Sequence, residues 1–141
     1  THDREILDYI KRSNQIMQEH AWDSLYGGYY RSLNRDLTVQ DDDKDFSPQL
    51  APVSGYLIYL YLATREQAYL DQMERILEVV TRKMRFKDEP WILERFDRQW
   101  NYTYSIREDS TEVNTGHHAE VVWMLLRLHR LTRKDAYLKR P

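Results

Sequence analysis

Two nearly identical heptapeptides constrain the fold of this chain more than any other feature of its sequence. TREQAYL occupies residues 64–70 and TRKDAYL occupies residues 132–138, so the second begins 68 residues after the first. Such a recurrence indicates an internal repeat. At this spacing, each half of the chain contains a helical pattern, a long segment rich in polar residues and a second helical pattern. The sequence therefore predicts two helical hairpins whose loops each span roughly 25 residues.

The periodicity of apolar residues sets the bounds of the expected helices. Helices are expected over residues 3–20, from about Pro48 to Thr64, over residues 67–84 and over residues 115–132, and a fifth is expected to begin at Asp135. One stripe of the first helix is expected to contain Ile6, Leu7, Ile10, Ser13 and Met17, with charged residues on the opposite face. After that helix, Gly27, Gly28 and an alternation of apolar residues predict a turn or short β-hairpin. Pro52 is compatible with the second helix only if that helix starts later than Pro48.

The repeat excludes the usual helical solenoids and leaves a ring of hairpins. Its unit is far longer than the ~34 to 47 residues of tetratricopeptide or armadillo repeats. We therefore expect an all-α fold in which antiparallel helical hairpins form part of a toroid and the long loops gather at one end. The units are expected at about residues 1–66 and 67–134, followed by a stub of a third at 135–141, with Gln49 and His117 at equivalent positions.

The position of the second heptapeptide predicts that these 141 residues are a single-domain fragment of a longer repeat protein. In a closed ring each hairpin is buried against both neighbours, so two hairpins alone expose apolar edges through which the fragment is expected to self-associate. The alternative is a small, free-standing helical protein.

Composition and charge exclude several kinds of partner. The net charge of −2 comes from 21 basic and 23 acidic residues that are mixed along the chain, so nothing indicates binding to nucleic acid or to a membrane surface. The longest apolar run, GYLIYLYLA, is far shorter than the roughly 20 residues of a membrane span. Cysteine is absent, which excludes disulfides and is compatible with the cytoplasmic location that we expect. The 11 tyrosines and 4 tryptophans are typical of sugar-binding surfaces, but such residues also fill core margins.

The densest group of chemically competent side chains lies in NTGHHAEVVWMLLRL, residues 114–128. His117 and Glu120 are three residues apart, so they share one face at the start of an apolar helix. There His117 is able to exchange a proton with a ligand while Glu120 orients the ring and stabilises its charged form. The positive end of the helix dipole acts in the opposite direction. A histidine that caps the helix or fills the core margin is the other interpretation.

This part of the sequence resembles a known enzyme family. GHHAEVVWMLLRLHRLTRKDAYL is similar to the GHxxE-x-x-W-x-L segment of the N-acylglucosamine 2-epimerase family, which includes cellobiose 2-epimerases and aldose–ketose isomerases. WDSLYGGYYRSLNRD, followed by Lys44 and Gln49, resembles the family's D-x-x-x-GG loop and K-x-x-x-x-Q helix start. The resemblance covers most of the chain and implies an (α/α)6 barrel of six hairpins, which agrees with the toroid that the repeat predicts.

The resemblance also implies a reaction and a set of residues. The histidine matching His117 belongs to active-site histidines that move a proton at the carbon next to a sugar carbonyl, and Glu120 supports it. The substrate is a carbohydrate, and neither a cofactor nor a metal is implied. The residues expected to bind the substrate are Tyr29, Gln49, Trp100, His118 and Trp123. The family often has an arginine in place of Ala51 and has further histidines in later hairpins, so we expect an isomerase whose fragment is inactive alone.

Two other functions remain open at this stage. Asp23, Asp97 and Asp109 lie in the loops, where six-hairpin glycosidases place the paired carboxylates of hydrolysis. A carboxylate pair about 5 to 10 Å apart in the mouth of the barrel is the sign of that chemistry. The second alternative is a non-catalytic helical module that binds a glycan or a protein through its aromatic loops.

Other familiar motifs fail on their spacing. DDDKD resembles the start of an EF-hand, but Phe46 and Pro52 replace the required glycine and glutamate, so a solvated turn is expected there. The histidine pair at 117–118 with Glu120 does not follow the H-E-x-x-H zinc pattern, and the chain has neither a P-loop nor a G-x-G-x-x-G motif. Metal and nucleotide binding therefore have no support in the sequence.

Overall fold

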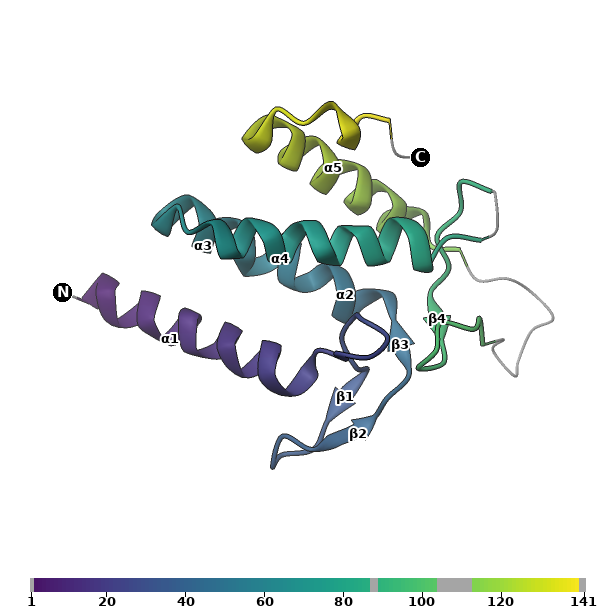
Figure 1. The fold of residues 1–141 in the computed structure, drawn as a ribbon, viewed down its shortest axis with the longest axis horizontal. Helices are drawn as coiled ribbons and strands as arrows, with labels where there is room; N and C mark the ends of the chain where they lie inside the picture. Colours follow the sequence, from purple (N-terminus) through teal and green to yellow (C-terminus); the bar gives the residue numbers. More distant parts are fainter. Residues whose placement is uncertain (1, 87–88, 104–112, 140–141) are drawn as a thin grey trace.

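A computed structural model describes residues 2–86, 89–103 and 113–139 of the chain (Figure 1). The α-helices in these residues are α1 (His2–Ile16), α2 (Phe46–Pro52), α3 (Ile58–Thr64), α4 (Gln67–Glu78) and α5 (Thr115–Thr132). Short turns of other helical types are η1 (Met17–Ala21), η2 (Val53–Leu57) and η3 (Val79–Lys83), which are π-helical, and η4 (Asp135–Tyr137), which is a 3-10 turn. The strands are β1 (Ser32–Leu33), β2 (Val39–Asp41), β3 (Lys44–Asp45) and β4 (Arg95–Phe96).

The helices form two antiparallel hairpins. The chain runs one way through α1 and η1, returns through α2, η2 and α3, and repeats this course with α4, η3 and then α5 (Figure 1). Both long loops lie at the same end, where β1 pairs with β2 and β3 pairs with β4. The returning helices are neighbours, because η2 contacts α5. The predicted all-α arrangement of hairpins with loops on one side is therefore confirmed.

Most helix bounds agree with the periodicity of the sequence, but the second helix differs. It starts at Phe46, two residues before the predicted start, so Pro52 lies inside the helix and not in its first turn. Proline has no N–H group to donate to the carbonyl one turn earlier. The chain continues directly into the wider π-helical turn η2, which carries the helix past this missing bond. The predicted fifth helix is only the 3-10 turn η4.

The predicted stripe of α1 is only partly covered by the rest of the protein. Ile6 is 48% exposed and Ser13 is also exposed. The most buried residue of this helix is Asn14, whose side chain accepts a hydrogen bond of 3.1 Å from the hydroxyl of Tyr56. A helix at the edge of the stack has one neighbouring layer only, so its buried face is narrower than the apolar pattern suggests.

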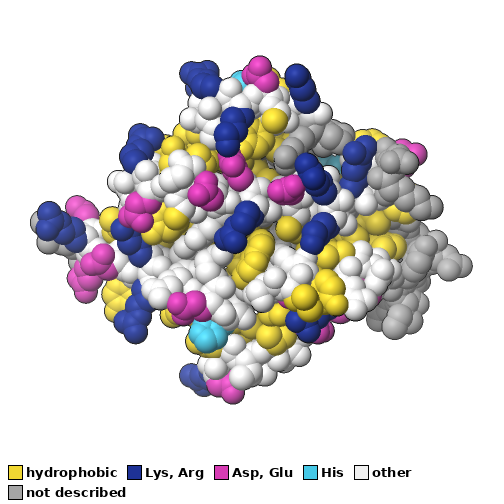
Figure 2. Space-filling model, viewed as in Figure 1, with side chains coloured by type: hydrophobic (Ala, Val, Ile, Leu, Met, Phe, Trp, Pro, Cys, Tyr) yellow, Lys and Arg dark blue, Asp and Glu magenta, His cyan; other side chains and the backbone are white. Residues whose placement is uncertain are grey.

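The core lies between the two hairpins. Its fully buried members come from α2 to α5 with the turns η2 and η3, and include Phe46, Leu50, Val53, Leu57, Ile58, Leu60, Met73, Ile76, Leu77, Val80, Met124 and Leu128. The loop end closes on this core through Leu93 and Phe96. The outer face, in contrast, carries acidic and basic side chains interspersed among hydrophobic ones (Figure 2).

The heptapeptides are helix ends. Thr64 and Thr132 each donate a side-chain hydrogen bond of 2.8 Å to the carbonyl four residues earlier. The next residues, Arg65 and Arg133, have left-handed backbones with φ of 61° and 60°, which stop the helix. The repeated Thr-Arg therefore marks the point at which each hairpin ends.

The first parts of the two loops have the same backbone hydrogen bonds, but at a spacing of 63 residues and not 68. Tyr30 donates to the carbonyl of Ala21 as Leu93 donates to that of Met84, in both cases at 2.8 Å. Further along, Leu37 and Trp100 both have positive φ, of 68° and 70°. At the start of the returning helices, Gln49 is the fourth residue of α2 and His117 is the third residue of α5.

Candidate active site

His117 stands in the first turn of α5, and the sequence around it explains why the helix begins there. Asn114 has an extended backbone, and its side-chain oxygen accepts hydrogen bonds from the N–H groups of Gly116 and His117, at 2.9 and 3.3 Å. An asparagine at this position satisfies helix donors that otherwise lack partners. His117 is thus placed on a well-defined helix start at the loop end of the molecule.

Two contacts hold the imidazole ring of His117. Its Nδ1 atom lies 2.8 and 3.0 Å from the two carboxylate oxygens of Glu94. Its ring stacks on Phe46, with centroids 4.3 Å apart and planes within 15°. The Phe46 N–H group also donates to the Glu94 carbonyl at 3.0 Å. Glu94, Phe46 and His117 therefore form one cluster, contributed by the second loop, α2 and α5.

The predicted partner of the ring was Glu120, and the structure gives a different one. Glu120 makes no hydrogen bond or ion pair with any described residue, whereas Glu94 makes both of its side-chain contacts with His117. The residue three positions along a helix is a neighbour of His117, but the ring turns toward α2. Glu94 lies 23 residues earlier, and no spacing rule connects it to His117. The pairing of β3 with β4 places Glu94 beside Phe46, on which the His117 ring stacks.

His118 is engaged by the backbone. Its Nε2 atom accepts from the N–H group of Ile92 at 2.9 Å, and its Nδ1 atom donates to the carbonyl of Asn114 at 2.8 Å. Because a backbone N–H group only donates, this arrangement fixes the neutral form that carries its proton on Nδ1. The edge of the ring also meets Trp91. His118 therefore joins the second loop to α5, and its assignment to substrate binding stays a prediction.

Tyr29 of the first loop and Gln49 of α2 lie together, and both are fully buried. The Tyr29 N–H group donates to the Gln49 side-chain oxygen at 2.7 Å, and the Gln49 amide donates back to the Tyr29 carbonyl at 2.8 Å. The Tyr29 hydroxyl accepts a hydrogen bond from Gln18. A glutamine side chain that pairs with a backbone in this way replaces a missing strand partner. Their predicted role in substrate binding is not tested by these contacts.

Trp100 and Trp123 lie at separate places. Trp100 donates from Nε1 to the carbonyl of Tyr26 at 3.0 Å and covers Gly28. Gly28 has φ of +78°, and a β-carbon there would lie 2.5 Å from the Trp100 ring, so only glycine fits. Trp123 is 42% exposed on α5, with the Arg127 guanidinium 4.7 Å from its ring centroid. The structure thus groups Trp100 with Tyr29 and Gln49, and keeps Trp123 apart from them.

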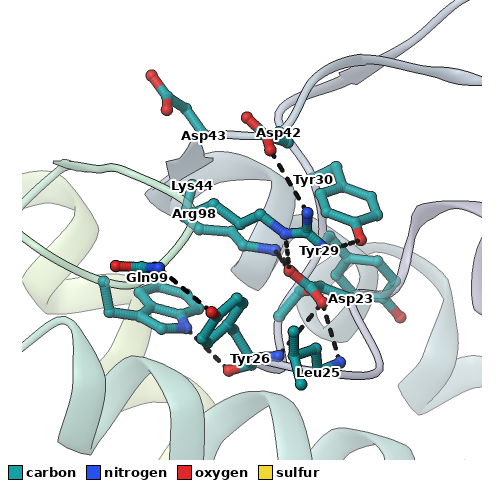
Figure 3. Close-up of polar contacts among 12 residues, drawn as sticks. Asp23, Leu25, Tyr26, Tyr29, Tyr30, Asp42, Asp43, Lys44, Arg98 and Gln99 are labelled. Atoms are coloured by element: carbon teal, nitrogen blue, oxygen red, sulfur yellow. Dashed lines mark hydrogen bonds and ion pairs between the residues drawn. The ribbon is translucent and has the colours of Figure 1, made fainter.

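A buried ion pair organises the first loop (Figure 3). Asp23 and Lys44 both have side chains no more than 1% exposed, and the Lys44 Nζ atom lies 3.2 Å from the Asp23 carboxylate. Arg98 reaches the same carboxylate oxygen at 3.0 Å from the second loop, and the other oxygen accepts from the N–H groups of Leu25 and Tyr26. The network ties the Gly-Gly turn, β3 and the second loop into one unit.

Asp23 and Asp97 lack the raised pKa that the general acid of a glycosidase needs. Burial acts to raise the pKa of Asp23, but hydrogen bonds from Arg98, from two backbone N–H groups and from Lys44 outweigh it, so that pKa lies well below its usual range. The side chain and backbone of Asn101 lower the pKa of Asp97. A general acid in glycoside hydrolysis needs a raised pKa. Asp109, the third carboxylate predicted for hydrolysis, lies outside the described residues.

The acidic turn in DDDKD has a cationic partner within the protein. Carboxylate oxygens of Asp41, Asp42 and Asp43 lie within 4.8 Å of one another. Arg31 reaches Asp41 at 3.2 Å and Asp45 at 2.8 Å, so a guanidinium already balances this cluster. The turn lies beside an open polar hollow of about 580 Å³ that includes Tyr30. We assign no metal to these residues.

Sequence comparison identifies the family of the chain. The sequence model of N-acylglucosamine 2-epimerase (GlcNAc 2-epimerase) matches residues 53–140, which include α5 and His117. The chain belongs to the N-acylglucosamine 2-epimerase family. None of the curated proteins matches the sequence.

Solved structures of sugar epimerases and isomerases have the same fold. Cellobiose 2-epimerase from Bacillus thermoamylovorans B4167 superposes with a TM-score of 0.76 at 21% identity, over 92% of this chain and 35% of that chain. Cellobiose 2-epimerase from Spirochaeta thermophila DSM 6192 gives 0.74 at 15% identity, over 93% and 34%. A D-mannose isomerase gives 0.81 at 17% identity, over 96% and 36%.

The epimerase-family chain spans about a third of the length of these structures. Its two hairpins correspond to part of the (α/α)6 barrel fold, as the repeat and the resemblance predicted. Among the described residues, no helix combines the length and apolar character needed to cross a membrane.

Proposed function

We propose that this protein is a carbohydrate 2-epimerase or aldose–ketose isomerase in which His117 exchanges a proton at the carbon next to the sugar carbonyl. One observation carries the proposal. The ring of His117 is held between a carboxylate and an aromatic ring at the start of the helix, within the segment that matches the family. A histidine oriented in this way is suited to proton transfer.

The chemistry requires a group that gains and loses a proton near neutral pH. The base removes the proton from C2 of an open-chain aldose, and the electrons of that C–H bond form the C1–C2 double bond of an enediolate. A proton returned to the opposite face of C2 gives the epimer, and a proton delivered to C1 gives the ketose. Imidazole performs such steps without a large shift of its acidity, which a carboxylate does not.

The proposal includes the other residues that the family resemblance suggested. Glu120 would support the reaction, and the residues in contact with the sugar would include Tyr29, Gln49, Trp100, His118 and Trp123. It requires no cofactor, and it includes the expected cytoplasmic location. Because the chain spans about a third of the related structures, the activity is proposed for the closed barrel and not for two hairpins alone.

Deuterium incorporation tests this function. The protein is incubated with candidate aldoses in deuterated water, and if the 141 residues belong to a longer protein, that protein is assayed. We expect deuterium at C2 of an epimer, or at C1 of a ketose. His117→Asn keeps size and polarity but removes proton exchange, so the rate should fall by about 10²- to 10⁴-fold. His129→Asn, at the other end of α5, is the matched control and should keep the rate.

A different result would point to the hydrolase alternative. Full activity in His117→Asn contradicts the histidine assignment. So does an unlabelled C2 in a reaction that cuts glycosidic bonds, and a carboxylate mechanism would then replace the proposal.

The proposal also includes self-association through α5. Val122 and Leu126 are 55% and 48% exposed. At the heptapeptide spacing they correspond to Ser54 and Ile58 of the first hairpin, which are half-buried and buried, and η2 in that hairpin contacts α5. In the first hairpin, α5 covers this face of the returning helix. In the second hairpin, the corresponding face of α5 is exposed at Val122 and Leu126. A second copy of the chain would fill this position, because an apolar patch of this kind favours a partner.

A further inference from the structure

We propose that Glu94 is the positioning residue of His117, which keeps the ring proton on Nδ1 and leaves Nε2 as the nitrogen that reacts. This inference rests on the proposed function, because it names the reacting atom of the same histidine. Sequence reasoning assigned the supporting role to Glu120. The geometry assigns it to a residue of the second loop.

The contact with Glu94 determines which nitrogen of His117 carries the ring proton. An ionised carboxylate only accepts hydrogen bonds, and both oxygens of Glu94 lie within 3.0 Å of His117 Nδ1. The neutral ring must therefore carry its proton on Nδ1 to satisfy this contact. Its lone pair is then on Nε2, for which the described residues provide no hydrogen-bond donor.

Phe46 and Glu94 together determine the orientation of the His117 ring. Stacking on Phe46 fixes the plane of the imidazole, since the two planes are within 15° of each other. The carboxylate of Glu94 then fixes the rotation of the ring within that plane. When both the plane of the ring and its rotation are fixed, the lone pair on Nε2 points in one direction. Efficient proton transfer requires such a fixed orientation of the base.

Backbone contacts on both sides hold Glu94 itself in place. Its carbonyl accepts from the Phe46 N–H group at 3.0 Å, and the preceding residue, Leu93, donates to the Met84 carbonyl at 2.8 Å. After it, β4 pairs with β3, with Arg95 opposite Asp45. The carboxylate therefore reaches His117 from a backbone whose position is set before any ligand binds.

Burial makes the Glu94 carboxylate depend on its hydrogen bond with His117. The side chain of Glu94 is 11% exposed, and within the described part of the chain its carboxylate has His117 as its hydrogen-bond partner. A carboxylate that has lost most of its water needs such a donor. The pair is thus coupled, since releasing the ring leaves the carboxylate without a donor.

The movement of protons follows from these contacts. Nε2 takes the proton from C2, the electron pair of the C–H bond passes into the C1–C2 double bond, and the ring becomes an imidazolium that keeps its Nδ1 proton. Glu94 stays ionised throughout and neither gives nor receives a proton, as an orienting carboxylate does. Nε2 then delivers its proton to C1 of the enediolate, which gives the ketose once the hydroxyl proton has moved from O2 to O1. The epimer forms when a second acid of the closed barrel delivers a proton to the opposite face of C2.

The experiment reads the position of the ring proton by ¹⁵N NMR of the histidine side chains. At about pH 9 an imidazole group is neutral, and the two nitrogens give distinct signals. In the unmodified protein we expect the neutral ring of His117 to be protonated only on Nδ1. In Glu94→Gln the amide offers either a carbonyl or an NH₂ group to Nδ1, so the form protonated on Nε2 should become populated. In the barrel, kcat should fall by about 10²- to 10⁴-fold with little change in KM.

Two further variants make the result specific. Glu94→Asp keeps acceptor-only oxygens and should retain the Nδ1 form, which also controls for loss of structure. Glu120→Gln should leave the ring proton unchanged, because the described residues give Glu120 no contact with the ring. The proposal is overturned if Glu94→Gln leaves the proton on Nδ1, or if Glu120→Gln moves it. The NMR result decides the role of Glu94 and deuterium labelling decides the function, so each can fail separately.

Discussion

Among single residues, the buried pair of Asp23 and Lys44 has the largest expected effect on stability. Neither side chain is more than 1% exposed, and Lys44 also lies 4.2 Å from the centroid of the Tyr30 ring. Burial lowers the pKa of Lys44, and hydrogen bonding and charge interaction with Asp23 oppose that shift. A buried cation depends on its partner, because removing one member leaves an uncompensated charge.

Asp23→Asn tests this dependence. The variant removes the negative charge, and we expect a loss of about 3 to 5 kcal/mol in the free energy of unfolding. Denaturant unfolding near pH 7 measures it. Asp42→Asn is the control, because Asp42 is half exposed and lies 3.7 Å from Arg98, so its loss should be about 0 to 1 kcal/mol. Equal losses in the two variants would contradict a specific role for the buried pair.

The same pair gives a dependence on pH with a defined sign. Contacts in the folded protein hold the pKa of Asp23 below the unfolded value of about 3.9. Its stabilising contribution is therefore complete above that value and decreases as the pH falls toward the folded pKa. The difference in stability between the unmodified protein and Asp23→Asn should shrink when unfolding is repeated below about pH 4.

Residue contacts of this kind are where the sequence is least informative. Lys44 is 21 residues from Asp23, and Glu94 is 23 residues from His117. Helical spacing predicts neighbours three or four positions apart, as it did for Glu120. Contacts within a long loop, or between a loop and a helix, depend instead on how the loops fold and the hairpins stack, which the local pattern does not contain. The family resemblance supplied His117, but nothing in the quoted motif pointed to Glu94.

The elements were predicted far better than the contacts. The bounds of α5 and the start of α4 follow the periodicity of the sequence, since both helices bury a continuous apolar face. The error at the second helix arose from Pro52, which the chain accommodates by a π-helical turn that no simple rule anticipates. The single spacing of 68 also hid the spacing of 63 in the loops, because only the helix ends retain similar residues.

Gly28→Ala tests the architecture of the first loop. The left-handed backbone is costly for alanine, and the new methyl group would meet the Trp100 ring at 2.5 Å. We expect a loss of about 2 to 4 kcal/mol, from backbone strain and overpacking together. Gly55→Ala is the matched control, because a β-carbon there meets nothing within 4 Å and alanine favours the helix, which predicts a gain of roughly 0.5 to 1 kcal/mol. Thermal unfolding of both variants gives the comparison, and a neutral Gly28→Ala would show that the loop relaxes.

The whole molecule is a stack of two hairpins with an uncovered side at α5 (Figure 1). In the first hairpin, the returning helix is covered by α5 of the second hairpin. The corresponding face of α5 has no such neighbour among the described residues, and Val122 and Leu126 are exposed there. Sequence alone gave the toroid, because a repeat of this length with long loops has few other solutions. It did not show which side chains remain exposed, since the apolar pattern of α5 is the same whether or not a neighbour is present.

Self-association through this side is the prediction that belongs to the whole molecule. Light scattering of the 141-residue chain should give a mass that rises with concentration. Leu126→Glu places a charge in the apolar patch of Val122, Trp123 and Leu126, and should weaken association by about tenfold or more. Leu25→Glu is the control, because Leu25 is 71% exposed in the first loop, away from this patch, and should not alter the mass. A stable monomer at all concentrations, or equal effects of the two substitutions, would show that α5 is tolerated as a free surface. In that case the two hairpins would be a self-sufficient unit, with the free-standing helical protein as its explanation.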